Sequence, residues 1–111
     1  MASEEECPVR KLPPIDVSKY ENLQNQISSL GNKYRIAILL EISTFGELCA
    51  CDLVPVLKLS QSSVTLHLQK LYREGFLKKQ ERGKYTYYRL NEERKDILEL
   101  FRMLDSEILQ L

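Results

Sequence analysis

The sequence predicts a mainly α-helical chain that carries one β-hairpin, and three observations lead to this fold class. A helix should begin after Ser60, which is a favourable N-cap residue and is followed by apolar residues at helical spacing. Gly75 stands where this helix should end, because glycine adopts the left-handed conformation of a C′ residue without steric cost. Two strand-like runs, residues 76–81 and 85–90, flank the short connection Arg82-Gly83-Lys84, as in a hairpin. Helix, turn, helix and hairpin in this order are the outline of a winged helix-turn-helix.

The helix after Ser60 has an apolar face and a polar face. Val64, Leu68 and Leu71 fall at positions i, i+4 and i+7, so they share one face, which we expect to be buried. In a winged helix-turn-helix this second helix enters the major groove of double-stranded DNA, and the hairpin tip lies along the backbone or in the adjacent minor groove. The residues expected to contact operator DNA are Ser60, Gln61, Ser62, Ser63, Thr65 and Lys70 on the helix and Arg82 and Lys84 on the hairpin.

The charges are unevenly distributed along a chain whose net charge is zero. Residues 57–90 hold eight Lys or Arg and two acidic residues, whereas residues 1–56 hold five basic and eight acidic ones, and residues 91–111 hold three and six. Positive charge is therefore concentrated on the segment predicted to read DNA, as neutralisation of phosphates requires. The alternative is that the basic hairpin is only a solvated surface.

The chain should form one domain preceded by an arm. Residues 1–17 contain prolines and no sustained periodicity, so we expect a flexible N-terminal arm. Residues 18–111 should form the winged helix-turn-helix and its dimerisation surface. No run is long enough to cross a membrane and the N-terminus lacks the layout of a signal peptide, so we expect a cytoplasmic protein.

Capping residues predict where the first two helices begin and end. Ser18 and Glu21 form a capping-box pair at the start of a helix over residues 18–30. A second helix should cover residues 33–44, and Gly46 should end it.

A proline and an asparagine predict the remaining two helices. Pro55 is tolerated only within the first turn of a helix, so the helix that precedes the reading helix should cover about residues 51–58. Asn91 is a plausible N-cap for a last helix over about residues 92–110.

The first and last helices carry more apolar residues than one small domain is expected to cover. We therefore expect a homodimer in which a partner chain covers these stripes, and two reading helices then fit a palindromic site. The alternative is that the last helix packs only on its own domain. The expected interface residues are Tyr20, Leu23, Ile27, Ile97, Phe101, Leu104 and Ile108.

Several motifs together resemble one known family of proteins. These are Glu47-Leu48-Cys49-Ala50-Cys51-Asp52-Leu53, residues 59–68 (LSQSSVTLHL), Gly83-Lys84 and Tyr87-Tyr88-Arg89-Leu90. In this order and spacing they resemble the ArsR/SmtB family of metal-responsive repressors. The resemblance implies a dimeric winged helix-turn-helix that occupies its operator without metal and leaves it when metal binds. It also implies that His67 contacts DNA, although a partly buried histidine with a satisfied hydrogen bond is the alternative.

The segment Glu47–Leu53, which we call the cysteine box, resembles the thiolate site of the arsenic, antimony, cadmium and lead sensors in this family. Cys49 and Cys51, with Cys7 reaching from the arm, would supply three sulfur ligands, which suit As(III) or Sb(III), and less specifically Pb, Bi or Cd. Two residues at i and i+2 of a helix point about 200° apart, whereas in an extended segment they project to the same side. We therefore expect metal binding to hold or pull the start of their helix out of helical geometry. The resemblance implies no organic cofactor.

Two other readings of the cysteines remain open. They could form a redox switch on the same fold, or they could be inert residues in a repressor that answers to another signal. A small thiol enzyme is disfavoured, because the sequence has neither a phosphate-binding loop nor a Cys-x-x-Cys motif.

Overall fold

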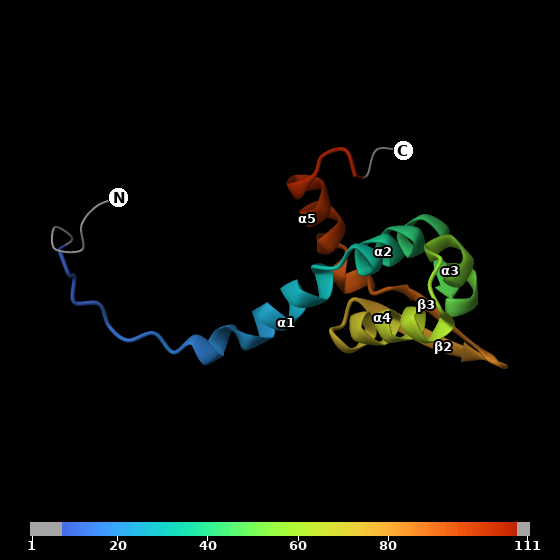
Figure 1. Ribbon diagram of the computed structural model, residues 1–111, viewed down its shortest axis with the longest axis horizontal. Coiled ribbons are helices and arrows are strands. Elements are labelled where there is room, and N and C mark those ends of the chain that lie inside the picture. The colour runs from blue at the N-terminus through green and yellow to red at the C-terminus, as the bar shows by residue number, and fades with distance from the viewer. Residues whose placement is uncertain (1–7, 109–111) are drawn as a thin grey trace.

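A computed structural model describes residues 8–108 of the chain. Residues 8–16 contain no helix or strand, and no helix of the described part is long and apolar enough to cross a membrane. The elements, in chain order, are a 3₁₀-helix Val17–Tyr20, α1 Glu21–Leu30, α2 Lys33–Phe45, β1 Glu47–Cys49, α3 Ala50–Leu57, α4 Gln61–Arg73, β2 Leu77–Arg82, β3 Tyr85–Leu90, a 3₁₀-helix Glu92–Arg94 and α5 Asp96–Leu104. Figure 1 shows α2, α3, α4 and the hairpin forming one body, from which α1 and α5 extend.

The predicted winged helix-turn-helix is confirmed. Helices α3 and α4 form the helix-turn-helix pair, and β2 and β3 form the hairpin, or wing, that follows it. The sequence did not predict β1, a three-residue strand that pairs antiparallel with β3 and gives the sheet the order β1-β3-β2. In this pairing Glu47 lies opposite Arg89 and Cys49 opposite Tyr87, so the cysteine box is tied to the wing.

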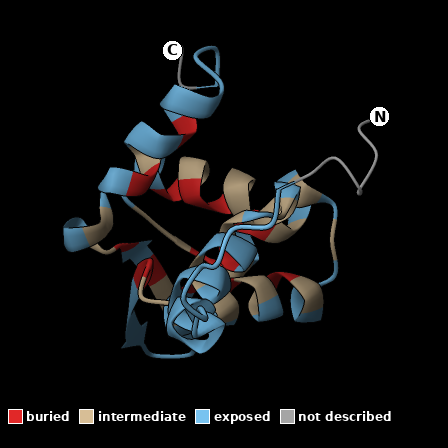
Figure 2. Ribbon diagram, turned by 90° about the vertical axis from the view of Figure 1, so that its left-hand side faces the viewer, coloured by how far each residue is buried: buried red, intermediate tan, exposed pale blue. Residues whose placement is uncertain are grey.

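The core lies where α2, α3 and α4 meet the sheet. The apolar face predicted for α4 is confirmed, because Val64, Leu68 and Leu71 have no exposed surface. They pack with buried side chains of the neighbouring elements, and Figure 2 marks the buried residues in red. The residues contributed by those elements are Ile38, Leu39 and Ile42 of α2, Leu53 of α3, and Phe76 and Leu77 at the start of the wing.

Both predicted ends of α4 are confirmed. The Ser60 hydroxyl accepts a hydrogen bond from the backbone N–H of Ser63 at 3.2 Å. At the other end Gly75 has φ +84°, and the N–H groups of Gly75 and Phe76 donate to the carbonyls of Tyr72 and Leu71. This is a Schellman arrangement, which needs a residue that tolerates a left-handed backbone.

Two predicted boundaries are wrong. Ser18 and Glu21 do not form a capping box, because Asp16 accepts the Ser18 N–H and caps a 3₁₀-turn, so that α1 begins only at Glu21. The last helix is also shorter than predicted. Asn91 caps the 3₁₀-helix Glu92–Arg94 rather than α5, and extended backbone at Asp105 ends α5.

The predicted dimer surface needs a correction at two residues. Ile97 and Phe101 are only 2% and 7% exposed and belong to the core of their own chain, because α5 turns one face onto it. The other predicted interface residues are exposed in the single chain: Tyr20, Leu23, Ile27, Leu104 and Ile108. An apolar groove of about 390 Å³ between α1 and α5 is lined by several of these residues.

Arg35 connects the first helices to α4. Its Nε and one terminal nitrogen donate to the carbonyls of Ser29 and Ser28 at 2.6 and 3.2 Å. Its other terminal nitrogen donates to Nδ1 of His67 at 3.1 Å, and the His67 ring stacks on Tyr34 with 5.7 Å between centroids. Burial, and secondarily the Arg35 charge, hold the pKa of His67 below its usual value.

Replacing Leu68 with alanine should lower the free energy of unfolding by about 2–5 kcal/mol, because a fully buried side chain leaves a cavity. Leu66 is the matched control, since it lies two positions away on the same helix but is 62% exposed. Leu66→Ala should change stability by about 0.5 kcal/mol or less. Urea denaturation of both variants measures this, and equal losses would show that α4 does not turn this face inward.

His67 is the only histidine, so its ring protons can be followed individually by NMR during a pH titration. We expect a pKa below about 6.5, the usual value for histidine, and Arg35→Gln should move it part of the way back. The unfolded chain then binds the proton more tightly, so the stability from this site is present above the usual pKa and is lost as the pH falls from there through the lowered pKa of the folded chain. His67→Gln should remove part of this acid loss, and a pKa at or above the usual value would contradict the contact.

Candidate metal centre and nucleic-acid interface

Cys49 and Cys51 meet at the junction of β1 and α3. Cys49 is the last residue of β1 and has an extended backbone with φ −95° and ψ 167°, whereas Cys51 is the second residue of α3. Cys49 is buried, with 3% of its surface exposed, and Cys51 is exposed. The structure joins their two sulfurs as a disulfide. The expectation that the start of this segment is held out of helical geometry is confirmed at Cys49, which lies before α3 in extended backbone, and no part of α3 has to unwind for the sulfurs to converge.

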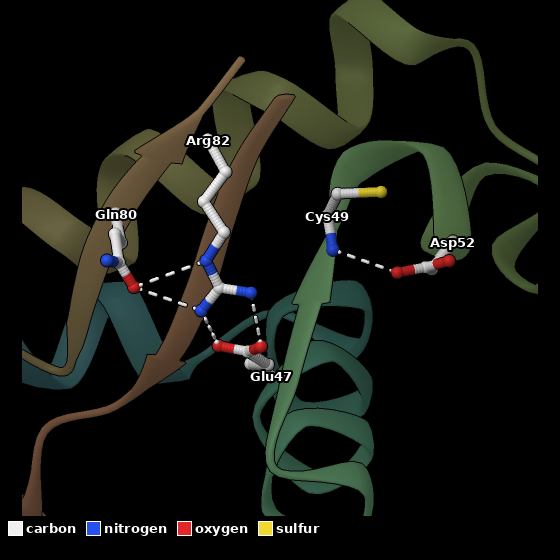
Figure 3. A network of polar contacts seen from close by, with 5 residues as sticks. All are labelled: Glu47, Cys49, Asp52, Gln80 and Arg82. Atoms are coloured by element: carbon white, nitrogen blue, oxygen red, sulfur yellow. Dashed lines mark hydrogen bonds and ion pairs between the residues drawn. The ribbon is translucent and has the colours of Figure 1, made fainter. Parts of the chain in front are cut away.

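Asp52 is a third group at this junction, and sequence reasoning did not select it. Its Oδ2 accepts a hydrogen bond from the backbone N–H of Cys49 at 3.0 Å, as Figure 3 shows. One ligand atom each from Cys49, Cys51 and Asp52 lies within 4.8 Å of the others. The signal was present, since an acidic residue three positions after an N-cap residue folds back onto it. Cys7, the predicted third sulfur ligand, lies outside the described residues.

Cys49 and Cys51 open onto a pocket of about 230 Å³ between α4 and the wing. Its walls come from three parts of the chain that are distant in sequence. Besides both cysteines and Ala50, the lining residues are Gln61 and Thr65 at the start of α4 and Lys84, Tyr85, Thr86 and Tyr88 of the wing. Three of the residues predicted to contact DNA, Gln61, Thr65 and Lys84, therefore face the same space as the sulfurs.

The other predicted DNA-contacting residues of α4 lie at its exposed N-terminal end or along its side. The Ser60 hydroxyl bonds those of Ser62 and Ser63 at 3.1 and 3.0 Å, which joins the three serines in one cluster at the helix start. Ser62 is exposed and Lys70 is half-buried. His67 is half-buried and accepts the Arg35 hydrogen bond, which is the arrangement of the alternative reading.

Arg82, predicted to contact DNA, is paired within the chain. Its two terminal nitrogens donate to both carboxylate oxygens of Glu47 at 2.7 and 2.6 Å, and Oε1 of Gln80 accepts from the same side chain. The guanidinium also lies 4.7 Å from the centre of the Tyr87 ring. The hydrogen bond from Arg82 lowers the pKa of Glu47 and raises that of Arg82. Lys84, in contrast, is exposed at the tip of the wing.

Comparison with known proteins places this chain in one family. Residues 32–79 match the family model described as "Bacterial regulatory protein, arsR family". The chain is 32% identical over 82 residues to the "Arsenical resistance operon repressor" of Bacillus subtilis (strain 168), a match that covers 71% of this chain and 78% of that protein.

Two further proteins are similar to this chain. The "Arsenical resistance operon repressor" of Escherichia coli (strain K12) is 40% identical over 62 residues, which is 56% of this chain, and the match spans about half (53%) of that relative's length. The solved structure of HlyU from Vibrio cholerae N16961 is similar to this chain, with a TM-score of 0.67 and 26% sequence identity. The match covers 83% of this chain and 99% of the HlyU chain. The chain belongs to the arsR family of bacterial regulatory proteins, whose fold is that of a DNA-binding regulator and not of an enzyme.

Proposed function

We propose that the protein is a transcriptional repressor that binds operator DNA as a homodimer and is released when As(III) or Sb(III) binds Cys49 and Cys51 in their reduced, thiolate form. The observation that carries this proposal is the pocket in which both sulfurs lie beside Gln61, Thr65 and Lys84. Soft sulfur ligands select thiophilic ions, and Pb, Bi or Cd would bind the same groups less specifically. The names of the two arsenical resistance repressors support arsenic as the ion.

Ion binding and operator binding exclude each other in this proposal because they use one space. The start of α4 and the tip of the wing must both reach the DNA at the same time. An ion held by Cys49 and Cys51 adds atoms between them, so each ligand weakens the other by the same factor. No unwinding of α3 is needed. In this proposal Cys7 would supply a third sulfur ligand, and the Asp52 carboxylate is a further donor close to the two sulfurs.

The proposed DNA contacts divide into two kinds. Gln61, Ser62 and Thr65 lie at the start of α4, with side chains of the kind that bond base edges in the major groove. Ser60, Ser63, Lys70 and Lys84 are assigned to the sugar–phosphate backbone. The homodimer would form through the exposed apolar residues of α1, Leu104 at the end of α5 and Ile108 after it, which leaves the two copies of α4 free to reach successive major grooves.

Arsenite should release the protein from a fluorescently labelled fragment of its own promoter, as measured by anisotropy. Cys49→Ser and Cys51→Ser should each raise the arsenite concentration for half-release by about tenfold or more, because a ligand is lost. Cys7→Ser tests the third ligand in the same assay. The proposal fails if arsenite never releases the DNA, or if Cys49→Ser responds as the unaltered protein does.

Lys84→Ala should weaken binding to all DNA sequences and reduce the slope of log affinity against log salt by about one, because one phosphate contact is lost. Gln61→Ala should instead reduce the preference for the operator over random DNA. Lys95→Ala is the control, since Lys95 is exposed and paired with Glu92 beyond the wing. If both variants weakened binding to operator and to random DNA by the same factor, this division of the DNA contacts would be contradicted.

A redox-responsive repressor is the second candidate, and the contact between the two sulfurs favours it. Two thiols would lose two protons and two electrons to a peroxide, which is reduced to water, or to a disulfide, which is reduced to thiols. This candidate expects release of DNA by peroxide without any metal, and recovery with a thiol reductant. Release by arsenite under reducing conditions would instead support the metalloid response.

A further inference from the structure

Arg82 is anchored to all three strands of the sheet. It belongs to β2, its guanidinium covers Tyr87 of β3, and it forms two hydrogen bonds with Glu47 of β1. Among the four ion pairs of residues 8–108, this is the one that joins distant parts of the sequence, since the other three join residues two or three positions apart. Figure 3 shows the pair beside the strand that leads to Cys49.

The side chain of Arg82 lies on the face of the wing that is turned away from α4. Side chains alternate along a strand, so Arg82 and Gln80 share one face of β2, and Lys79 lies on the other. Lys79 contacts the Tyr72 ring of α4, with its nitrogen 4.6 Å from the ring centre, which identifies the face toward α4. Arg82 therefore lies on the opposite face, where Glu47 and Gln80 already occupy its donors.

Strand β1 has few other constraints. It is three residues long and an edge strand, so β3 is the one strand that bonds its backbone, and Asp52 accepts the N–H of Cys49 at its last position. Glu47 stands at its first position and Cys49 at its last. An ion pair at the first position limits fraying of the whole strand, because three residues cannot bend independently of one another.

We propose that Arg82 is a positioning residue, which through Glu47 holds β1 on the wing and so keeps Cys49 in place beside Cys51. Where Cys49 is an ion ligand, this inference rests on the proposed function, and it gives the wing a mechanical connection to the thiol site. Arg82 then acts within the sheet instead of on a phosphate, and Lys84 remains as the cation of the wing tip.

The test measures the protection of the buried Cys49 thiol in a Cys7→Ser, Cys51→Ser chain, which has one reactive sulfur. Alkylation by iodoacetamide is followed by mass spectrometry. Glu47→Gln and Arg82→Gln should each accelerate the alkylation about three- to fivefold, which is the change in equilibrium constant expected when an exposed ion pair of moderate strength is lost. The double variant should react no faster than either single one, because both changes break the same pair. Arg102→Gln, which breaks the exposed Arg102–Glu99 pair of α5, should leave the rate unchanged.

Three results would overturn the inference: unchanged rates in both single variants, additive effects in the double variant, or equal acceleration by Arg102→Gln. Arg82→Gln should also reduce the salt dependence of DNA binding less than Lys84→Ala does, and an equal reduction with unchanged alkylation would make Arg82 a phosphate contact. With all three cysteines present, Glu47→Gln should weaken arsenite binding by the same three- to fivefold. If the unaltered chain binds no arsenite while the alkylation rates change as expected, the proposed function fails and the positioning role stands.

Discussion

The pairing of β1 with β3 is the constraint on which the thiol site depends. It holds Cys49 in extended geometry immediately before α3, so its sulfur meets that of Cys51 without any distortion of the helix. The same three residues bring Glu47 to Arg82 and place Cys49 opposite Tyr87. A strand of this length contributes little stability, yet it decides which side chains face one another. The cysteine box, the wing and the start of the reading helix thereby become one structural unit.

The positive charge that this unit presents to solvent depends on contacts within the chain as well as on the number of its basic residues. Residues 57–90 carry a strong excess of basic side chains, which suits a DNA-binding surface. One of them, Arg82, is neutralised by an acidic residue from outside this segment, and Lys79 lies against an aromatic ring. A count of charges along the sequence therefore overestimates the cations that are free to meet phosphates. Lys84 and the exposed start of α4 remain directed to solvent around the pocket that also contains the sulfurs.

The single chain leaves much apolar surface uncovered. Helix α1 extends from the body, and Leu23 and Ile27 on it are more than half exposed, as is Leu104 at the end of α5. A domain of this size has too small a core to compensate for such exposure, so a second copy is the simplest cover. The surface of α4 and the wing is not used in such an arrangement and stays free.

The sequence by itself determined the elements whose signals are local. Ser60 and Gly75 delimit α4, the aromatic and branched residues on either side of Arg82-Gly83-Lys84 predict a hairpin, and the spacing of Val64, Leu68 and Leu71 predicts the buried face. Each of these signals depends on residues that are close in the sequence. Only the tertiary structure decided the rest. Strand β1 is too short to show a pattern, the burial of Ile97 and Phe101 depends on how α5 meets the core, and the partners of Arg82 and His67 lie 35 and 32 residues away. Side chains that distant are brought together by packing, which no local pattern encodes.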